Sequence, residues 1–176
     1  VRGSDQSRVN VTINGIPYND SESMSVYWVN LPDFASSIES IQIQRGVGTS
    51  TNGSAAFGGS INILTNAASD KASYEINNTL GSFNTVKNSV GFSTGFINNK
   101  FELSGRLSRI KSSGYIDRSG SKLRSYFLQG IYKDENTLVK ILNFAGHEIT
   151  DQAWFGVDTS TLETNRKYNP AGEYYD

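Results

Sequence analysis

The chain has 176 residues, with 16 Lys and Arg against 17 Asp and Glu, no cysteine and one histidine. This even charge balance argues against nucleic acid as a partner, because binding to a phosphate backbone needs a basic excess. The composition excludes disulfides, thiolate metal sites and a His-rich metal cluster within the chain. No apolar run approaches the ~18 residues of a membrane-spanning helix.

The first predicted elements are short. Residues 9–13 alternate apolar and polar side chains, and Asn14-Gly15 then predicts a hairpin, because this pair accepts the positive φ angles of a type I′ turn. Residues 30–37 allow one short helix, with Asn30 as its cap and Pro32 in its first turn. Two further strands are expected, a half-buried one at 38–46 and another at 61–64. Residues 1–68 therefore predict a small mixed domain.

Residues 69–176 predict antiparallel strands without helical periodicity. Five strands of roughly 8–12 residues are expected, within 73–81, 85–96, 100–107, 122–133 and 136–146, and globular domains usually have ~5–6 residues per strand. Tight turns at Asn98-Asn99 and Asp134-Glu135 are separated by a longer link at 112–121. Long strands with short turns on one rim and longer loops on the other are typical of an outer-membrane barrel. A soluble β-sandwich has the same alternation and stays open as an alternative.

The glycine-rich segment from Arg45 to Thr65 does not match a nucleotide site. The third glycine of G-x-G-x-x-G is missing, and no G-K-[ST] motif occurs. The single histidine, His147, has no identifiable nucleophile and is interpreted as a solvated residue at a strand end. Carboxylate pairs lie at turns, where they are ordinarily solvated. The sequence therefore predicts no catalytic residue, no metal site, no cofactor and no enzyme activity.

The same segment matches another pattern when its flanks are included. SIESIQIQRGVGTSTNGSAAFGGSINILT, residues 37–65, closely resembles the end of the plug domain of TonB-dependent outer-membrane receptors. In that family an I-E-x-I-x-V-x-R-G strand leads through small residues to a G-G-x-I-N-I strand. VNVTINGIPY and the initial VRG resemble other plug motifs, and residues 19–37 resemble the Bacteroidetes receptors. Val47 and Asn52 depart from the Pro and Tyr that are usual in the family.

This resemblance implies a fold and a function. The expected fold is mainly β, with the C-terminal part of a small α+β plug at 1–68 and the first strands of an incomplete, plugged antiparallel transmembrane β-barrel at 69–176. The chain would be a fragment of a bacterial outer-membrane receptor that imports a scarce nutrient (siderophore, cobalamin, glycan or peptide) into the periplasm. Its partners would be the TonB complex, reached through an N-terminal segment that this chain lacks, outer-membrane lipid and a surface lipoprotein. A soluble β-rich binding or adhesion module is the alternative.

The resemblance also assigns roles to residues. Arg2 and Arg45 would lock the plug by pairing with glutamates of the barrel wall, and Glu75 and Glu102 are in range by sequence. Small glycines would let the plug backbone pass close to other backbone, and the loop places them at Gly46, Gly53, Gly58 and Gly59.

Two sets of apolar and aromatic residues complete the expectations. A plug apical loop would offer ligand contacts through Tyr18, Asn19, Tyr27 and Trp28, although Trp28 can equally pack against the short helix. One face of the strand at 85–96 would meet lipid through Val90, Phe92 and Phe96.

Overall fold

The structure is a computed structural model, and it describes residues 3, 5–47 and 57–173. The chain divides into two compact units, the first made of residues 1–28 and 34–68 and the second of residues 29–33 and 69–176. A search of the described residues for helices found none long and apolar enough to cross a membrane.

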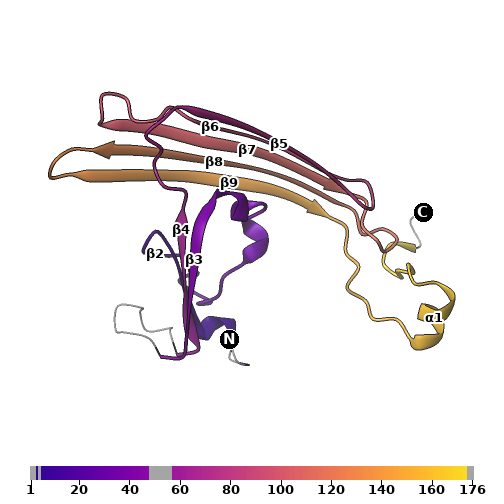
Figure 1. Cartoon of the computed structure of the whole chain (residues 1–176). Helices are drawn as coiled ribbons and strands as arrows, with labels where there is room; N and C mark the ends of the chain where they lie inside the picture. The colour runs from indigo at the N-terminus through magenta and orange to yellow at the C-terminus, as the bar shows by residue number, and fades with distance from the viewer. Residues whose placement is uncertain (1–2, 4, 48–56, 174–176) are drawn as a thin grey trace. The chain divides into compact units, whose positions relative to one another are not determined.

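The first unit contains one four-stranded sheet (Figure 1). Its strand order is β2-β1-β4-β3, formed by β1 (Val9–Ile13), β2 (Ile16–Pro17), β3 (Ile38–Arg45) and β4 (Gly59–Thr65). β1 pairs antiparallel with β2 and parallel with β4, and β4 pairs antiparallel with β3. The predicted hairpin after β1 is confirmed, because Asn14 and Gly15 have φ angles of 51° and 82°.

The core of the first unit lies around β1. Its buried apolar side chains are Val9, Val11, Ile13, Val26, Phe34 and Ile63. The prediction that the strand at 38–46 is half-buried is wrong within this unit, since Ile41 and Ile43 are 53% and 60% exposed. β3 is the edge strand of its sheet, so it has a neighbouring strand on one side only.

The predicted short helix is replaced by two separate 3₁₀ turns, η2 (Trp28–Asn30) and η3 (Phe34–Ser37). A third 3₁₀ turn, η1 (Gln6–Arg8), precedes β1. Asp33 has a φ angle of 54°, in the left-handed region, which interrupts any continuous right-handed helix at this position. Asn30 is therefore the last residue of η2 and does not cap a helix.

The second unit is an antiparallel meander of five strands in one sheet, in the order of the sequence (Figure 1). The strands are β5 (Ser73–Gly81), β6 (Thr85–Ser93), β7 (Phe101–Ser112), β8 (Ser121–Lys133) and β9 (Leu138–Thr150). A short helix, α1 (Thr159–Thr164), follows them. The five predicted strands are confirmed, and because they form a single sheet, the second unit is not a β-sandwich.

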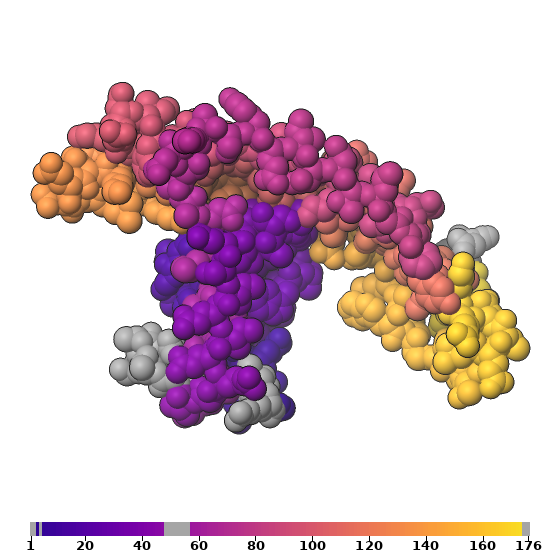
Figure 2. Space-filling view, viewed as in Figure 1, coloured from indigo at the N-terminus to yellow at the C-terminus, as the bar shows by residue number. Residues whose placement is uncertain are grey.

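The strand register separates two faces of this sheet. We call the face that contacts residues 29–33 the inner face and the opposite face the outer face. The inner face is largely polar and includes Lys87, Ser89, Ser93, Glu102, Ser104, Arg106, Ser108, Ser125 and Gln129. Its apolar residues include Ile110, Leu123, Phe127, Ile131, Leu142 and Phe144. No other element of the second unit packs on the upper, outer face in Figure 2.

The outer face carries most of the apolar side chains of the sheet. They are Tyr74, Ile76, Leu80, Val86, Val90, Phe92, Phe101, Leu103, Leu107, Tyr126, Leu128, Tyr132, Val139, Ile141, Ala145 and Ile149, and most of them are exposed. β6 ends at Ser93, so the predicted alternation to residue 96 is wrong, and Phe96 lies beyond the strand. The strand cannot continue there because Gly95 adopts a φ angle of +65°.

Candidate functional site

A cluster of charged residues holds the segment 29–33 to the inner face of the five-stranded sheet β5–β9, which we call the wall. Asp33 Oδ1 accepts a hydrogen bond from Lys87 Nζ at 2.6 Å, and Oδ2 accepts one from Arg106 Nη1 at 2.8 Å. The Ser108 hydroxyl also donates to Oδ2, and Arg106 Nη2 donates to the Asp33 carbonyl oxygen at 2.8 Å. The Asp33 side chain is only 8% exposed, so these charge-assisted bonds are shielded from water.

The neighbouring Pro32 packs against the same face. A Cβ atom added at Gly146 would overlap the Pro32 ring, so the absence of a side chain on β9 makes room for the proline. One carboxylate faces two cations here, and Lys87 and Arg106 are 26% and 12% exposed. The arrangement therefore fastens a loop by charge and shape.

Sequence reasoning did not identify this cluster. Lys87 and Arg106 lie at positions of β6 and β7 that the alternation assigns to the polar face, so their placement was predictable. Their partner was not, because Asp33 is 54 and 73 residues away from them in the sequence. An aspartate next to Pro32 in a segment rich in turn formers was the only local signal.

The two arginines predicted to lock the plug have different outcomes. Arg2 lies outside the described residues. Arg45 is the last residue of β3, opposite Gly59, and it is exposed. Of the two glutamates in range, Glu75 is exposed and accepts a hydrogen bond from Asn77. Glu102 is 3% exposed, its Oε1 accepts from Ser93, and its Oε2 has no hydrogen-bond partner among the described residues.

The glycine segment brings β3 and β4 close together at its described ends. Gly46 N donates to the Gly58 carbonyl at 3.2 Å, and Gly58 N donates to the Arg8 carbonyl at 2.8 Å. A Cβ atom at Gly59, whose φ angle is +153°, would lie 2.5 Å from the Gln44 carbonyl oxygen. Gly46 itself has a φ angle of +81°. Any larger residue at position 59 would separate the paired backbones, whereas Gly53 lies outside the described residues.

The four candidate ligand contacts separate into two kinds. Asn19 is engaged internally: its Oδ1 accepts from Val11 N at 2.7 Å, and its Nδ2 donates to the carbonyls of Val9 and Met24. Tyr18 is half-buried, and burial raises the pKa of its phenol. Asn19 therefore ties the loop to β1.

Tyr27 and Trp28 differ from this pair because each is 49% exposed. Tyr27 shares one weak hydrogen bond with the Ser23 hydroxyl, at 3.3 Å, and Trp28 begins η2. The loop before them is shaped by Asp20, whose carboxylate accepts from the Ser23 backbone N–H, and this bond lowers the pKa of Asp20. The two aromatic side chains are thus held on an ordered loop with their rings accessible.

Of the three residues predicted to face lipid, two lie on the outer face of the sheet and one lies beyond the end of its strand. Val90 and Phe92 lie on the outer face of β6 and are 50% and 36% exposed. Phe96 is half-buried beyond the end of the strand. His147 lies within β9 opposite Arg124, three positions before the strand ends at Thr150, so the interpretation as a strand-end residue is wrong.

The connections of the second unit differ between its two rims. One rim, which we call the turn rim, has the connections at 94–100 and 134–137. The opposite loop rim has the tight turn at 82–84, the link at 113–120 and the segment that follows β9. Two of these loop-rim segments are joined: Asn169 Nδ2 donates to the Asp117 carbonyl at 2.9 Å, and Arg118 Nε donates to the Ala171 carbonyl at 2.8 Å. The loop rim therefore carries the longest connection, at 113–120, and the structured segment after β9, together with the shortest turn, at 82–84.

Comparison with known proteins identifies the first part of the chain. The family model of the TonB-dependent receptor plug domain matches residues 1–60. No curated protein matches the chain by sequence. The matched region includes the strand at 38–46 and Gly58-Gly59, while Ile61, Asn62 and Ile63 follow directly after it.

Solved structures match the fold of both units. The ferric citrate transporter FecA in its unliganded form is 21% identical, with a TM-score of 0.71 over 97% of this chain and 27% of that one. The copper transporter OprC is 20% identical, with a TM-score of 0.70 over 89% of this chain and 25% of that one. The ferripyoverdine receptor of the outer membrane of Pseudomonas aeruginosa is 11% identical, with a TM-score of 0.63 over 78% and 18%.

The chain thus spans between 18% and 27% of the length of these three structures. The fold is that of a plugged antiparallel β-barrel, of which the second unit supplies wall strands. The family and the matching structures are receptors and transporters. Residues 1–60 match the plug domain family of TonB-dependent receptors, and both units have the fold of the matched outer-membrane receptor and transporters.

Proposed function

We propose that the whole protein is an active-transport receptor that binds a scarce nutrient and imports it into the periplasm with energy supplied by the TonB complex. The observation that carries this proposal is the succession of a plug domain and a sheet of long antiparallel strands with an exposed apolar face. The substrate would be a siderophore, a cobalamin, a glycan or a peptide. A surface lipoprotein would be a further partner, and no catalytic step is part of the proposal.

Ligand contacts within the plug are proposed at Tyr27 and Trp28. Both rings are exposed on a loop that Asn19 and Asp20 order through side-chain hydrogen bonds. Aromatic rings on a rigid loop stack against ligands at a low cost in conformational entropy. Tyr18 and Asn19 are proposed as supporting residues of this loop, in addition to the ligand role that the family resemblance implies.

A plug lock is proposed at Arg2 and Arg45. In this proposal their guanidinium groups pair with wall glutamates, and Glu102 is the preferred candidate because one of its buried carboxylate oxygens has no partner among the described residues. A buried carboxylate oxygen without a donor is costly, and a guanidinium would satisfy it with charge-assisted bonds.

Nutrient uptake by the full-length receptor tests the transport proposal. A strain without the gene is complemented with the wild-type receptor, the Arg45→Ala variant or the control Arg8→Ala, which removes another exposed arginine of the first unit. The wild type and the control should restore uptake of one of the four nutrient classes. Arg45→Ala should bind the nutrient but import it poorly, and its plug should be cleaved faster by protease.

The outcomes separate the two proposals. Unchanged uptake and protease resistance in Arg45→Ala remove the lock role but leave transport intact. A wild-type receptor that reaches the outer membrane and restores uptake of no nutrient class contradicts transport itself.

A further inference from the structure

A row of cationic side chains crosses the outer face of the wall near the loop rim. The strand register aligns Asn88, Arg109, Arg124 and His147 on four neighbouring strands. The next outer row toward the loop rim adds Lys111 and Lys122, which pair directly with each other. We call Arg109, Lys111, Lys122, Arg124 and His147 the basic belt.

The basic belt has no internal counter-charge. None of its five side chains forms an ion pair or a side-chain hydrogen bond with a residue that the structure describes. Across β5–β9 no Asp or Glu occupies the outer face, since Glu75, Glu102 and Glu148 all lie on the inner face. The next acidic residue after Glu148, Asp151, lies beyond the end of β9. Four permanently charged side chains lie on a face of the sheet on which the strands carry no carboxylate. Because opposite charges attract, this face would favour an anionic partner.

An apolar band begins next to the basic belt, on the side of the turn rim. The next outer row contains Val90, Leu107, Tyr126 and Ala145, and the band ends near the turn rim at Phe101 and Tyr132, whose ring centroids are 5.0 Å apart. From Leu107 to Phe101 the strand advances six residues, about 20 Å at ~3.3 Å per residue. At the strand tilt of about 35–45° in such barrels, this length is a height of about 15 Å, and Arg109, two residues further along β7, lies about 20 Å above Phe101. The basic belt therefore lies toward the edge of the ~25 Å apolar band.

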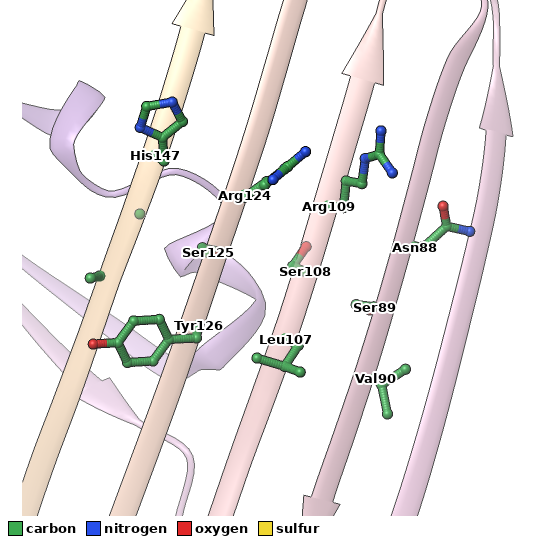
Figure 3. A pocket seen from close by; sticks show the side chains of 12 residues that line it. Asn88, Ser89, Val90, Leu107, Ser108, Arg109, Arg124, Ser125, Tyr126 and His147 are labelled. Atoms are coloured by element: carbon green, nitrogen blue, oxygen red, sulfur yellow. The ribbon is translucent and has the colours of Figure 1, made fainter.

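A shallow depression lies between the row that contains Arg109 and Arg124 and the row that contains Leu107 and Tyr126. It has a volume of about 570 Å³ and lies along β6–β9, with Asn88, Arg109, Arg124 and His147 on one side and Val90, Leu107, Tyr126 and Ala145 on the other. Figure 3 shows Arg109 and Arg124 on neighbouring strands, with Leu107 and Tyr126 one row away. One side of the depression thus offers guanidinium groups and the other offers apolar surface.

The geometry points to a binding site for a membrane lipid whose phosphate headgroup carries a net negative charge. We propose that Arg109 and Arg124 bind the phosphate oxygens as planar donors, that Lys111 and Lys122 add charge, and that an acyl chain covers Val90 and Leu107. The loop rim carries the longest connection, and the longer loops face the cell exterior in such barrels, so the lipid belongs to the outer leaflet. The inference requires the wall to lie in the membrane and does not depend on the transported nutrient.

Lipid retention by the full-length receptor tests this site. The receptor is reconstituted in phosphatidylcholine bilayers with a minority of phosphatidic acid, whose headgroup is a phosphate monoester, and is then extracted into detergent. The lipid that remains bound is identified by mass spectrometry. The wild type should retain phosphatidic acid in preference to phosphatidylcholine, and added salt should weaken this retention.

Three variants locate the preference on the basic belt. Arg109→Gln combined with Arg124→Gln should lower the retained phosphatidic acid at least about tenfold, since two charge-assisted contacts are lost. Replacing both arginines by lysine keeps the charge but loses the planar donors, so an intermediate loss is expected. Lys71→Gln removes an exposed cation that precedes β5 and should leave retention unchanged.

Several results would overturn the proposal. A wild-type receptor that retains both lipids equally, or retention that does not depend on salt, contradicts it without any variant, even where the glutamine variant fails to insert. Equal retention by wild type and the double glutamine variant also contradicts it. Displacement of phosphatidic acid by inorganic phosphate would mean that the acyl chain contributes nothing and that the site binds free phosphate. A dimer that covers this face and shows no lipid preference would identify a second copy as the occupant.

Discussion

Asp33 is the residue at which the second unit holds a distant segment of the chain. Its carboxylate accepts from Lys87, Arg106 and Ser108, and its carbonyl accepts a second bond from Arg106. Because the side chain is 8% exposed, water cannot replace these donors easily. A single aspartate therefore neutralises part of a cationic patch on a polar wall.

Replacing this aspartate tests its contribution to stability. Asp33→Asn should lower the free energy that holds residues 29–33 to the wall by ~3 kcal/mol, the lower end for a broken buried ion pair, because Lys87 remains partly hydrated. Hydrogen exchange of the backbone amides at 29–33 in the full-length receptor measures the loss. Asp70→Asn, at an exposed position, is the control. Equal exchange in wild type and Asp33→Asn would show that the cluster does not hold the segment.

At the scale of the element, two glycines on the outer face of the wall have opposite surroundings. A Cβ atom at Gly105 of β7 would lie 2.7 Å from Leu128 Cδ2 and 2.8 Å from Phe92 Cε1, so two large side chains cover this glycine. A Cβ atom at Gly130 of β8 would have no atom within 4 Å. Gly130 pairs with Leu103, two residues before Gly105, so the two positions are close neighbours on the same face.

These glycines form a matched pair of substitutions. Gly105→Ala should destabilise the full-length receptor by ~1–3 kcal/mol, because the new methyl group displaces Phe92 and Leu128 from their packing. Gly130→Ala should be neutral or stabilise by ~0.5–1 kcal/mol, because alanine loses less backbone entropy on folding. Urea unfolding of both variants in lipid vesicles measures the difference. Equal effects would show that Gly105 is not covered as described.

At the scale of the whole molecule, the wall is organised as a membrane-type surface. Apolar side chains occupy the outer face between the basic belt and the turn rim, and polar side chains dominate the inner face. A five-stranded sheet leaves its edge strands β5 and β9 each with one unpaired edge. Closure with further strands removes such edges, so this surface is stable only within a longer wall.

Lysine substitutions at two depths test the position of the membrane. Phe92→Lys, within the apolar band, should cost ~2–4 kcal/mol of folding free energy in a bilayer, while Asn88→Lys, in the row of the basic belt, should cost ~0–1 kcal/mol. Both positions lie on the outer face of β6, at different depths. Unfolding of the full-length receptor in vesicles provides the measurement. Similar costs at the two positions would contradict the placement of the apolar band.

Sequence patterns predicted the strands and turns whose conformation depends on neighbouring residues. Alternation located the five wall strands, and the Asn14-Gly15 and Asn98-Asn99 turns have the positive φ angles that their residue types favour. The predicted helix at 30–37 was wrong because Asp33 adopts a left-handed conformation that the sequence pattern does not reveal. The same residue makes the ion cluster, and that contact was missed because its partners lie 54 and 73 residues away in the sequence.

The sequence by itself determined the plug-domain match of residues 1–60, the five wall strands and the polarity of their two faces, because motifs and a two-residue period are properties of neighbouring positions. Only the tertiary structure decided that Asp33 meets Lys87 and Arg106, and that Arg109, Arg124 and His147 align in one row. Such contacts depend on strand register and on how a distant segment returns to the sheet. A one-residue shift in register would move every one of these side chains to the other face while leaving the pattern of strands intact.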